Sequence, residues 1–330
     1  MFVFDFLAGL ERPMKAIQMH SQGGPQQLVF EEVEKPLLDP GDAIVRVIAS
    51  SITKDELSWP PTYQTKDGQV RLPTIPGHEF AGIVEALAPE VADVRIGDEV
   101  YGLASFYRNG SAAEYLAVAA SDVAPKPKTL DFEQAAAVPL AGLTAWQALF
   151  DHGKLVAGQR VLIHGAAGGV GTFAVQLAHW KGAHVIATAS SSHADFLREI
   201  GADQVIDYEK DKFEEIVKDV DLVLDTVGGD LVERSRLVLS PTGMLITIVD
   251  SLPTDGAAAR TRELFFIVEP NRSELIELGK LIDAGKLKTI ISEVFPLDNA
   301  RKAFEKGLAG HVRGKIVLRV ANDAQSSAHA

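Results

Sequence analysis

The residues best suited to chemistry form one glycine-rich stretch, VLIHGAAGGVGTFAVQL at 161–177. Aligned with the dinucleotide-binding pattern G-x-G-x-x-G, its key positions are Ala166, Gly168 and Gly171, so alanine replaces the first glycine. Gly168 would let the backbone approach a pyrophosphate, and Gly171 would let the next helix pack closely on the preceding strand. Exposed N–H groups at the positive end of that helix would bind the phosphates. We therefore expect cofactor contacts from Ala166, Gly168, Gly169, Val170 and Gly171.

The context of this stretch favours a nucleotide site over the alternative, a glycine-rich turn without a ligand. The stretch begins in an apolar strand expected at 160–164 and continues into an amphipathic helix at 170–181. Beyond it, short apolar runs alternate with helical segments as far as residue 249. This alternation predicts an α/β unit with a parallel, doubly wound sheet, whose strands are apolar because both faces are buried.

The end of the expected second strand decides between NAD and NADP. An acid there would bind the ribose 2′-hydroxyl and repel a 2′-phosphate, but the residues at 187–193 are ATASSSH, and the first acid is Asp195. Ser190 can donate a hydrogen bond to phosphate, Arg198 can supply charge, and Tyr208 follows the third strand. We therefore predict NADPH as the cofactor. Helix capping by the serines and a solvated Arg198 are the alternatives.

The hydrophobic pattern of the first third of the chain differs from that of the middle. Polar and apolar residues alternate at 42–49, and short apolar runs occur at 80–87, 99–103 and 111–118. Such short strands between glycines and prolines predict an irregular, antiparallel, β-barrel-like domain. The segment 50–76, which carries four prolines, is expected to be a long polar loop of functional importance.

Composition excludes several classes of function. The 330 residues include 32 Lys and Arg against 45 Asp and Glu, a net charge of −13, so charge repulsion argues against nucleic acid and anionic membranes as partners. The chain has no cysteine, which rules out disulfides, thiolate catalysis and cysteine-based metal sites. The apolar N-terminus lacks a basic region, so we do not interpret it as a signal peptide. We expect a cytoplasmic protein.

Several motifs, in this order, resemble the medium-chain dehydrogenase/reductase superfamily, and most closely its zinc-independent quinone oxidoreductase-like branch. They are IPGHEFAGIV from Ile75, GDEVYG from Gly97, AGLTAW from Ala141, AAGGVG from Ala166, DTVGG from Asp225 and RGKIVL from Arg313. The resemblance extends from Met14 to Val320. It implies a GroES-like, β-rich catalytic domain at 14–140 and 286–330, and a Rossmann NADPH-binding domain at 141–285. Residues 1–13 would form an N-terminal extension.

The zinc alcohol dehydrogenases of this superfamily bind their catalytic zinc through Cys, His and Cys. By motif, the corresponding residues are Thr53, His78 and Leu140. Leucine cannot bind a metal and a threonine hydroxyl is a poor zinc ligand, so His78 is left alone. We expect no metal, and we interpret His78 as a structural or cleft-lining residue.

The resemblance also points to individual site residues. Thr144 matches a threonine that lies near the nicotinamide ribose in similar enzymes, although it could instead bond to its own helix backbone. Residues just after the fourth, fifth and sixth strands face the ligand crevice or belong to the core. The Arg-Gly-Lys motif lies near the cofactor in the family, or else its cations meet acidic neighbours. The residues after the three strands are Val227, Ile248 and Phe266, and the cations of the motif are Arg313 and Lys315.

The residues that would contact the substrate are less well defined by the sequence. Where the family often has Asn and Asp, this chain has Thr53 and Glu56. Tyr63 is a candidate proton or hydrogen-bond donor to an enolate, with solvent as the alternative donor. Trp59 is either an aromatic wall for a planar substrate or part of loop packing.

Without zinc, direct reduction of a carbonyl lacks its electrophile, whereas a quinone or an α,β-unsaturated carbonyl needs less help. We therefore predict an NADPH-dependent quinone or enone reductase. The alternatives are a zinc-free ketone or aldehyde reductase and a non-catalytic NADPH-binding sensor or partner protein. By resemblance, we expect a homodimer that pairs through the last Rossmann strand, near 264–268.

Overall fold

The computed structural model describes residues 13–249 and 262–321. Apart from Pro13, the expected N-terminal extension lies outside the described residues. The chain divides into two compact units. Unit 1 comprises Met1–Leu140, Pro270–Asp283 and Ile291–Ala330, and unit 2 comprises Ala141–Glu269 and Ala284–Ile290. None of the described helices is long and apolar enough to cross a membrane.

Unit 1 is built on a seven-stranded sheet with the order β14-β15-β3-β4-β5-β7, in which β6 also pairs with β3. All pairs are antiparallel except β14 with β15. A separate two-stranded sheet joins β1 and β2. The strands are β1 Met14–Met19, β2 Leu28–Val33, β3 Asp42–Ile52, β4 Glu79–Leu87, β5 Glu99–Leu103, β6 Tyr115–Ala119, β7 Val123–Pro125, β14 Ile291–Pro296 and β15 Lys315–Arg319.

Strand β3 is the centre of this sheet because it pairs with β4, β6 and β15. Alternation in its sequence predicts a half-buried strand, but nine of its eleven residues are buried. The polar residues Ser50 and Ser51 are buried with it, and their hydroxyls bond to Ser111 Oγ and to Ile316 O. The segment 50–76 is therefore not one long loop: β3 continues to Ile52, and the one-turn segments η2 (Glu56–Ser58) and α2 (Pro60–Tyr63) follow.

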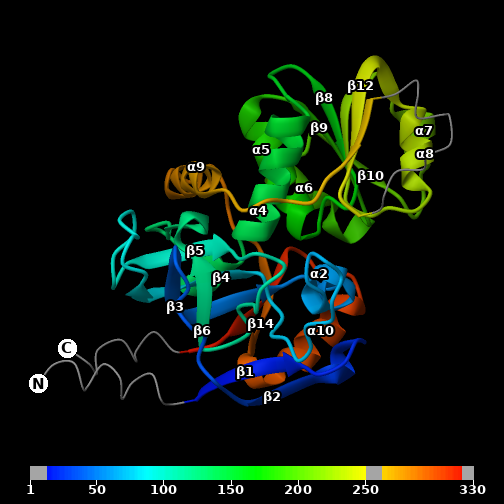
Figure 1. The fold of residues 1–330 in the computed structure, drawn as a ribbon. Helices are drawn as coiled ribbons and strands as arrows, with labels where there is room; N and C mark the ends of the chain where they lie inside the picture. The colour runs from blue at the N-terminus through cyan, green and yellow to red at the C-terminus, as the bar shows by residue number, and fades with distance from the viewer. Residues whose placement is uncertain (1–12, 250–261, 322–330) are drawn as a thin grey trace, which may run out of the picture. The chain divides into compact units, whose positions relative to one another are not determined.

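Unit 2 contains a six-stranded parallel sheet with the order β10-β9-β8-β11-β12-β13 (Figure 1). Numbered within the unit, this is 3-2-1-4-5-6, the order of the dinucleotide-binding Rossmann fold. The strands are β8 Arg160–Ile163, β9 His184–Ala189, β10 Gln204–Asp207, β11 Val220–Asp225, β12 Leu239–Thr247 and β13 Arg262–Phe265.

Helices cover both faces of this sheet, with α5 on one side and α7 and α8 on the other (Figure 1). Phe213 from α7 and Val232 from α8 pack with buried strand residues such as Leu162 and Val223. The expected α/β architecture with a β-rich second domain is thus confirmed. Besides α2, the α-helices of the described residues are α3 Phe132–Ala136, α4 Pro139–Trp146, α5 Gly169–Lys181, α6 Ala194–Glu199, α7 Phe213–Ile216, α8 Leu231–Arg236, α9 Arg272–Asp283 and α10 Ala300–Leu308.

The contacts of α9 place it in unit 1, whereas the sequence suggested a nucleotide domain that continues to residue 285. Tyr101 Oη donates to Leu275 O at 2.5 Å, and Arg272 Nη1 donates to Val123 O at 2.7 Å. Asp283 at the end of the helix accepts from Thr129 N and Oγ1. These bonds join residues far apart in the sequence, so periodicity could not reveal them.

Candidate functional site

The glycine-rich stretch forms a tight turn between β8 and α5. Gly168 is the N-cap of α5, and its N–H donates to Gly165 O at 2.9 Å. The first N–H groups of any helix have no partner within the helix, so those of Gly169, Val170 and Gly171 can bind an anion. Gly168, Gly169 and Val170 are partly exposed. This turn is therefore able to hold a pyrophosphate.

The backbone shows which of the glycines the turn requires. Gly165 has φ +66°, a left-handed conformation, and a Cβ there would lie 2.4 Å from Thr226 Oγ1. A Cβ on Gly171 would lie 2.3 Å from Gly165 O and 2.6 Å from Ala166 Cα. Ala166 itself is fully buried and needs no left-handed backbone. Alanine is therefore tolerated at the first fingerprint position because Gly165 makes the turn, which the motif alone did not reveal.

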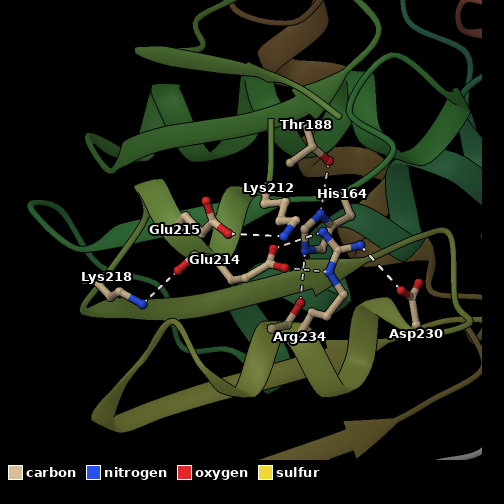
Figure 2. Close-up of polar contacts among 9 residues, drawn as sticks. His164, Thr188, Lys212, Glu214, Glu215, Lys218, Asp230 and Arg234 are labelled. Carbon is tan, nitrogen blue, oxygen red and sulfur yellow. Dashed lines mark hydrogen bonds and ion pairs between the residues drawn. The ribbon is translucent and has the colours of Figure 1, made fainter. Parts of the chain in front are cut away.

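A buried histidine lies directly before this turn (Figure 2). His164 Nδ1 lies 3.0 Å from Thr188 Oγ1, and its Nε2 lies 3.0 Å from Ser235 Oγ. Burial lowers the pKa of His164 to about 4, so the ring is neutral near pH 7. The two hydroxyls satisfy both ring nitrogens and connect β8 with β9 and α8. The sequence analysis gave this residue no role.

The loop after β11 is fixed by Asp225, the last residue of that strand. Its Oδ1 accepts hydrogen bonds from Val227 N at 2.9 Å and Gly228 N at 3.0 Å, and its Oδ2 accepts one from Thr247 Oγ1. Val227 is thereby held 52% exposed beyond the carboxyl end of the sheet. Ile248 follows β12 directly and is partly buried.

Phe266 follows β13 directly and is 9% exposed, with its ring centroid 4.6 Å from that of His152. Thr144 in α4 is 3% exposed. Both side chains are thus buried.

The residues expected at the adenosine ribose lie after β9 and β10. Ser190 is 8% exposed and its Oγ lies 2.9 Å from Ser192 Oγ. Tyr208 is 57% exposed, and its N–H donates to Ala189 O at the end of β9. Arg198 Nη1 donates to Asp195 Oδ1 at 2.9 Å, so an acid on its own helix partly balances its charge. Ser190 and Tyr208 are therefore the better supported pair.

Unit 1 contains a buried ion pair between β4 and β15. Glu79 Oε1 lies 2.6 Å from Lys315 Nζ, and the side chains are 1% and 7% exposed. Lys315 Nζ also donates to Ile52 O at 2.9 Å and to Thr53 Oγ1 at 3.3 Å. Lys315 thus forms an ion pair with Glu79 and donates two hydrogen bonds, to Ile52 and Thr53. Lys315, expected as a cofactor-binding cation, is instead held against Glu79 and Thr53, while Arg313 is exposed.

The positions of the zinc ligands in related alcohol dehydrogenases surround this ion pair. Thr53 accepts from Lys315, and Leu140 N donates to Glu79 Oε2 at 2.9 Å. His78 is the residue next to Glu79. The three positions are thus close in space, but they offer one imidazole, one hydroxyl and one alkyl group, and a zinc site needs at least three good ligands. The residues present do not fit a zinc ion.

Glu56 is the second carboxyl at this place. It is 1% exposed, and burial raises its pKa to about 8, although the charge of Lys315 and the backbone amides of Thr53 and Gly77 act in the opposite direction. At neutral pH Glu56 is therefore mostly protonated. Because Glu79 and Lys315 compensate each other, the buried cluster carries no net charge.

An aromatic group lies next to this cluster. Trp59 connects η2 and α2, and its ring is stacked 6.2 Å from that of His78 with an interplanar angle of 14°. Phe106 contacts both rings edge-on, at 5.8 Å from Trp59 and 4.8 Å from His78. Tyr63, expected as a proton donor, packs on the core cluster that includes Leu57.

Comparison with known proteins decides the family. Models of two protein domains match this chain: the alcohol dehydrogenase GroES-like domain at residues 39–128 and the zinc-binding dehydrogenase domain at 200–318. A probable zinc-binding oxidoreductase, mitochondrial, from Arthroderma benhamiae is 34% identical over 86% of this chain and 90% of its own. The chain belongs to the medium-chain dehydrogenase/reductase superfamily.

Two further relatives place it in the quinone oxidoreductase-like branch. The NADPH-dependent alkenal/one oxidoreductase, chloroplastic, of Arabidopsis thaliana is 32% identical over 94% of this chain and 81% of its own. The structure of the quinone oxidoreductase from Coxiella burnetii aligns with a TM-score of 0.86 at 36% identity, covering 94% of this chain and all of that one. The predicted resemblance is thus confirmed.

Substitutions of the two glycines should both weaken NADPH binding, but they should differ in their effect on stability. Gly171→Ala places a Cβ against backbone atoms, so we expect it to lower the free energy of unfolding by about 1–3 kcal/mol and to abolish NADPH binding. Gly168→Ala meets only Gly165 O at 3.3 Å and has an ordinary φ of −75°, so the fold should survive. Its methyl group would face the pyrophosphate, and NADPH affinity should fall at least about tenfold. Thermal unfolding and nicotinamide fluorescence measure both effects. Unchanged NADPH affinity in Gly168→Ala would contradict the assignment.

Protonation of Glu56 predicts an unusual dependence of stability on pH. Between about pH 4.5 and 8 the folded state keeps a proton that the unfolded state has lost, so the free energy of unfolding should fall as pH rises. Glu56→Gln removes this titration. The variant should match the wild type near pH 4.5 and exceed its stability by a few kcal/mol near pH 8. The exposed Glu305→Gln is the control. A constant difference across this range, measured by denaturant unfolding, would show that Glu56 is ionised in the fold.

Proposed function

We propose that this protein reduces quinones or α,β-unsaturated carbonyl compounds with NADPH, and that it does so without zinc. The observation that carries the proposal is the buried pair of Glu79 and Lys315, with Thr53 and Leu140 at two of the three ligand positions. A metal that polarises a carbonyl has no adequate ligand set here. The names of the Arabidopsis and Coxiella relatives support the same substrate class.

The residues of unit 2 fit the proposed cofactor. The amides of Gly169, Val170 and Gly171 would hold the pyrophosphate, and Ser190 with Tyr208 would recognise the 2′-phosphate. Val227, Ile248, Phe266 and Thr144, with Arg313 of unit 1, remain candidate contacts for the rest of the cofactor. When bound, NADPH supplies a hydride, which carries both electrons of the reduction.

The absence of a metal ligand set suits a conjugated substrate. Hydride addition to a quinone ring, or to the β-carbon of an enone, spreads the negative charge over the conjugated system to the oxygen. The protein then has to position the substrate and to donate a hydrogen bond where charge develops. Thr53, neutral Glu56 and Tyr63 are candidate donors of unit 1.

A homodimer is part of the proposal. Strand β13 is the last strand of its sheet and pairs only with β12 among the described strands, and Ile267 just beyond it is 62% exposed. An unpaired edge strand favours pairing with a second copy. Light scattering should give about twice the chain mass of 35.5 kDa, and a mass near 35.5 kDa would refute the dimer. Cytoplasmic location stays a prediction, and the Arabidopsis relative is named as chloroplastic.

The test of function is NADPH oxidation at 340 nm with 1,4-benzoquinone, a naphthoquinone, a linear enone and a saturated ketone. NADH is compared with NADPH on the best substrate. We expect turnover of the conjugated substrates, an inert ketone and a preference for NADPH. Turnover of the ketone alone would replace the proposal by carbonyl reduction. NADPH binding without turnover of any substrate would favour a binding protein.

A further inference from the structure

His78 stands out near the ion pair because both of its side-chain polar atoms are buried without a hydrogen-bond partner, whereas Glu56 and Glu79 each have one such atom. It is fully buried, and neither its Nδ1 nor its Nε2 makes a hydrogen bond to a described residue. Burial lowers its pKa to about 3, so the imidazole is neutral and has one N–H donor and one acceptor. A buried donor that lacks a partner costs the free energy of its lost hydration, so its retention requires an explanation.

The same chain provides a histidine of the opposite kind. His164 is equally buried, but Thr188 and Ser235 satisfy both of its ring nitrogens (Figure 2). His164 is therefore explained by its role in holding unit 2 together. His78 has no such role, because apolar side chains could fill its place without leaving a polar atom unsatisfied.

The backbone holds the ring of His78 in place. Gly77 before it has φ +89°, and a Cβ there would lie 2.9 Å from Ser111 Oγ. His78 O accepts a hydrogen bond from Ala104 N at 2.6 Å. Arg71 donates to Pro61 O and to Phe106 O, which ties the segment that carries Trp59 to the segment that carries Phe106. The imidazole is thus pre-positioned between these two aromatic side chains.

The walls around the imidazole define what it could bind. Trp59 stacks nearly parallel to the ring, and Phe106 meets both rings edge-on. Trp59 and Phe106 are both partly exposed, so these two rings lie between the buried imidazole and solvent. Flat aromatic faces favour a planar, conjugated ligand, and a neutral N–H favours an oxygen acceptor on it.

We propose that His78 donates a hydrogen bond to the carbonyl oxygen of a planar conjugated substrate that stacks on Trp59, and so replaces the metal as the electrophile. Because His78 is fully buried, the proposal requires the Trp59 or Phe106 ring to move before the substrate reaches the imidazole. The inference rests on the proposed function and names the residue that polarises the substrate. A neutral imidazole is suited to this task because it donates strongly without adding a charge to the buried site.

The chemical step balances. A carbon of the quinone ring, or the β-carbon of an enone, accepts the hydride that NADPH supplies, and the displaced π-electron pair moves to the oxygen. His78 stabilises the oxyanion through its N–H and keeps its own proton. One proton from solvent then completes the saturated carbonyl compound. In the quinone case, protonation of the oxyanion is followed by tautomerisation, in which the added hydrogen leaves the ring carbon as a proton and the second oxygen gains one, which gives the hydroquinone; NADP+ is released.

The decisive variant is His78→Leu, compared with His164→Leu. Leucine at 78 removes an unsatisfied polar group, so the unfolding temperature should stay the same or rise. Leucine at 164 leaves Thr188 and Ser235 unpaired, so the unfolding temperature should fall by several degrees. Turnover of 1,4-benzoquinone by His78→Leu should fall about 100-fold or more, the effect of removing one such donor, with unchanged NADPH affinity. His78→Gln, which keeps an N–H donor, should recover part of this loss.

Substrate binding is measured separately from turnover. With Trp146→Phe and Trp180→Phe, Trp59 is the single tryptophan, and 1,4-benzoquinone should quench its fluorescence at saturating concentration. Adding His78→Leu should weaken this binding at least about tenfold.

Each contrary result has its own meaning. If the wild type reduces no substrate but the fluorescence results hold, the proposed function fails and the assignment of His78 as a ligand-binding donor stands. Turnover and quinone binding by His78→Leu within about twofold of the wild type would overturn the assignment. So would a stoichiometric zinc ion that is lost in His78→Leu.

Discussion

Unit 1 depends on one buried ion pair. Lys315 is the first residue of the last described strand, and Glu79 begins a strand in the N-terminal part of the chain. The two charged groups are in contact at 2.6 Å and are almost fully buried. Neither charge can therefore be buried with its partner until the C-terminal segment packs against the N-terminal strand. Removing one partner of such a pair typically costs about 3–5 kcal/mol, because the other charge remains buried alone. The same ammonium also orients Thr53, so fold and site share this interaction.

The pair also shows why the residues at this place do not fit a zinc ion. Leu140 N and Thr53 Oγ1, at two former ligand positions, now bond to Glu79 and Lys315. Positive charge is still present at this place, but three partners hold it. Polarisation of a substrate is then left to neutral groups, and among the described residues His78 is a buried donor still available for it. A conjugated substrate is matched to this weaker electrophile because its own π system carries much of the developing charge.

Much of this could be predicted from the sequence, and the failures have a common physical cause. Alternation and apolar runs located the strands of both units, and the glycine-rich stretch located the turn before α5, because these signals are local. The motif could not show that Gly165, rather than position 166, adopts the left-handed backbone. Lys315 was expected at the cofactor, yet it is buried against Glu79, and α9 packs on Tyr101 of unit 1. Contacts between residues this far apart leave no periodic trace in one sequence.

The most direct test of a zinc-free active site is elemental analysis of the purified, fully active protein, with turnover measured before and after exhaustive chelation. The account predicts zinc well below one atom per chain and unchanged turnover after chelation. One zinc per chain, with activity that is lost on chelation and restored by zinc, would contradict it.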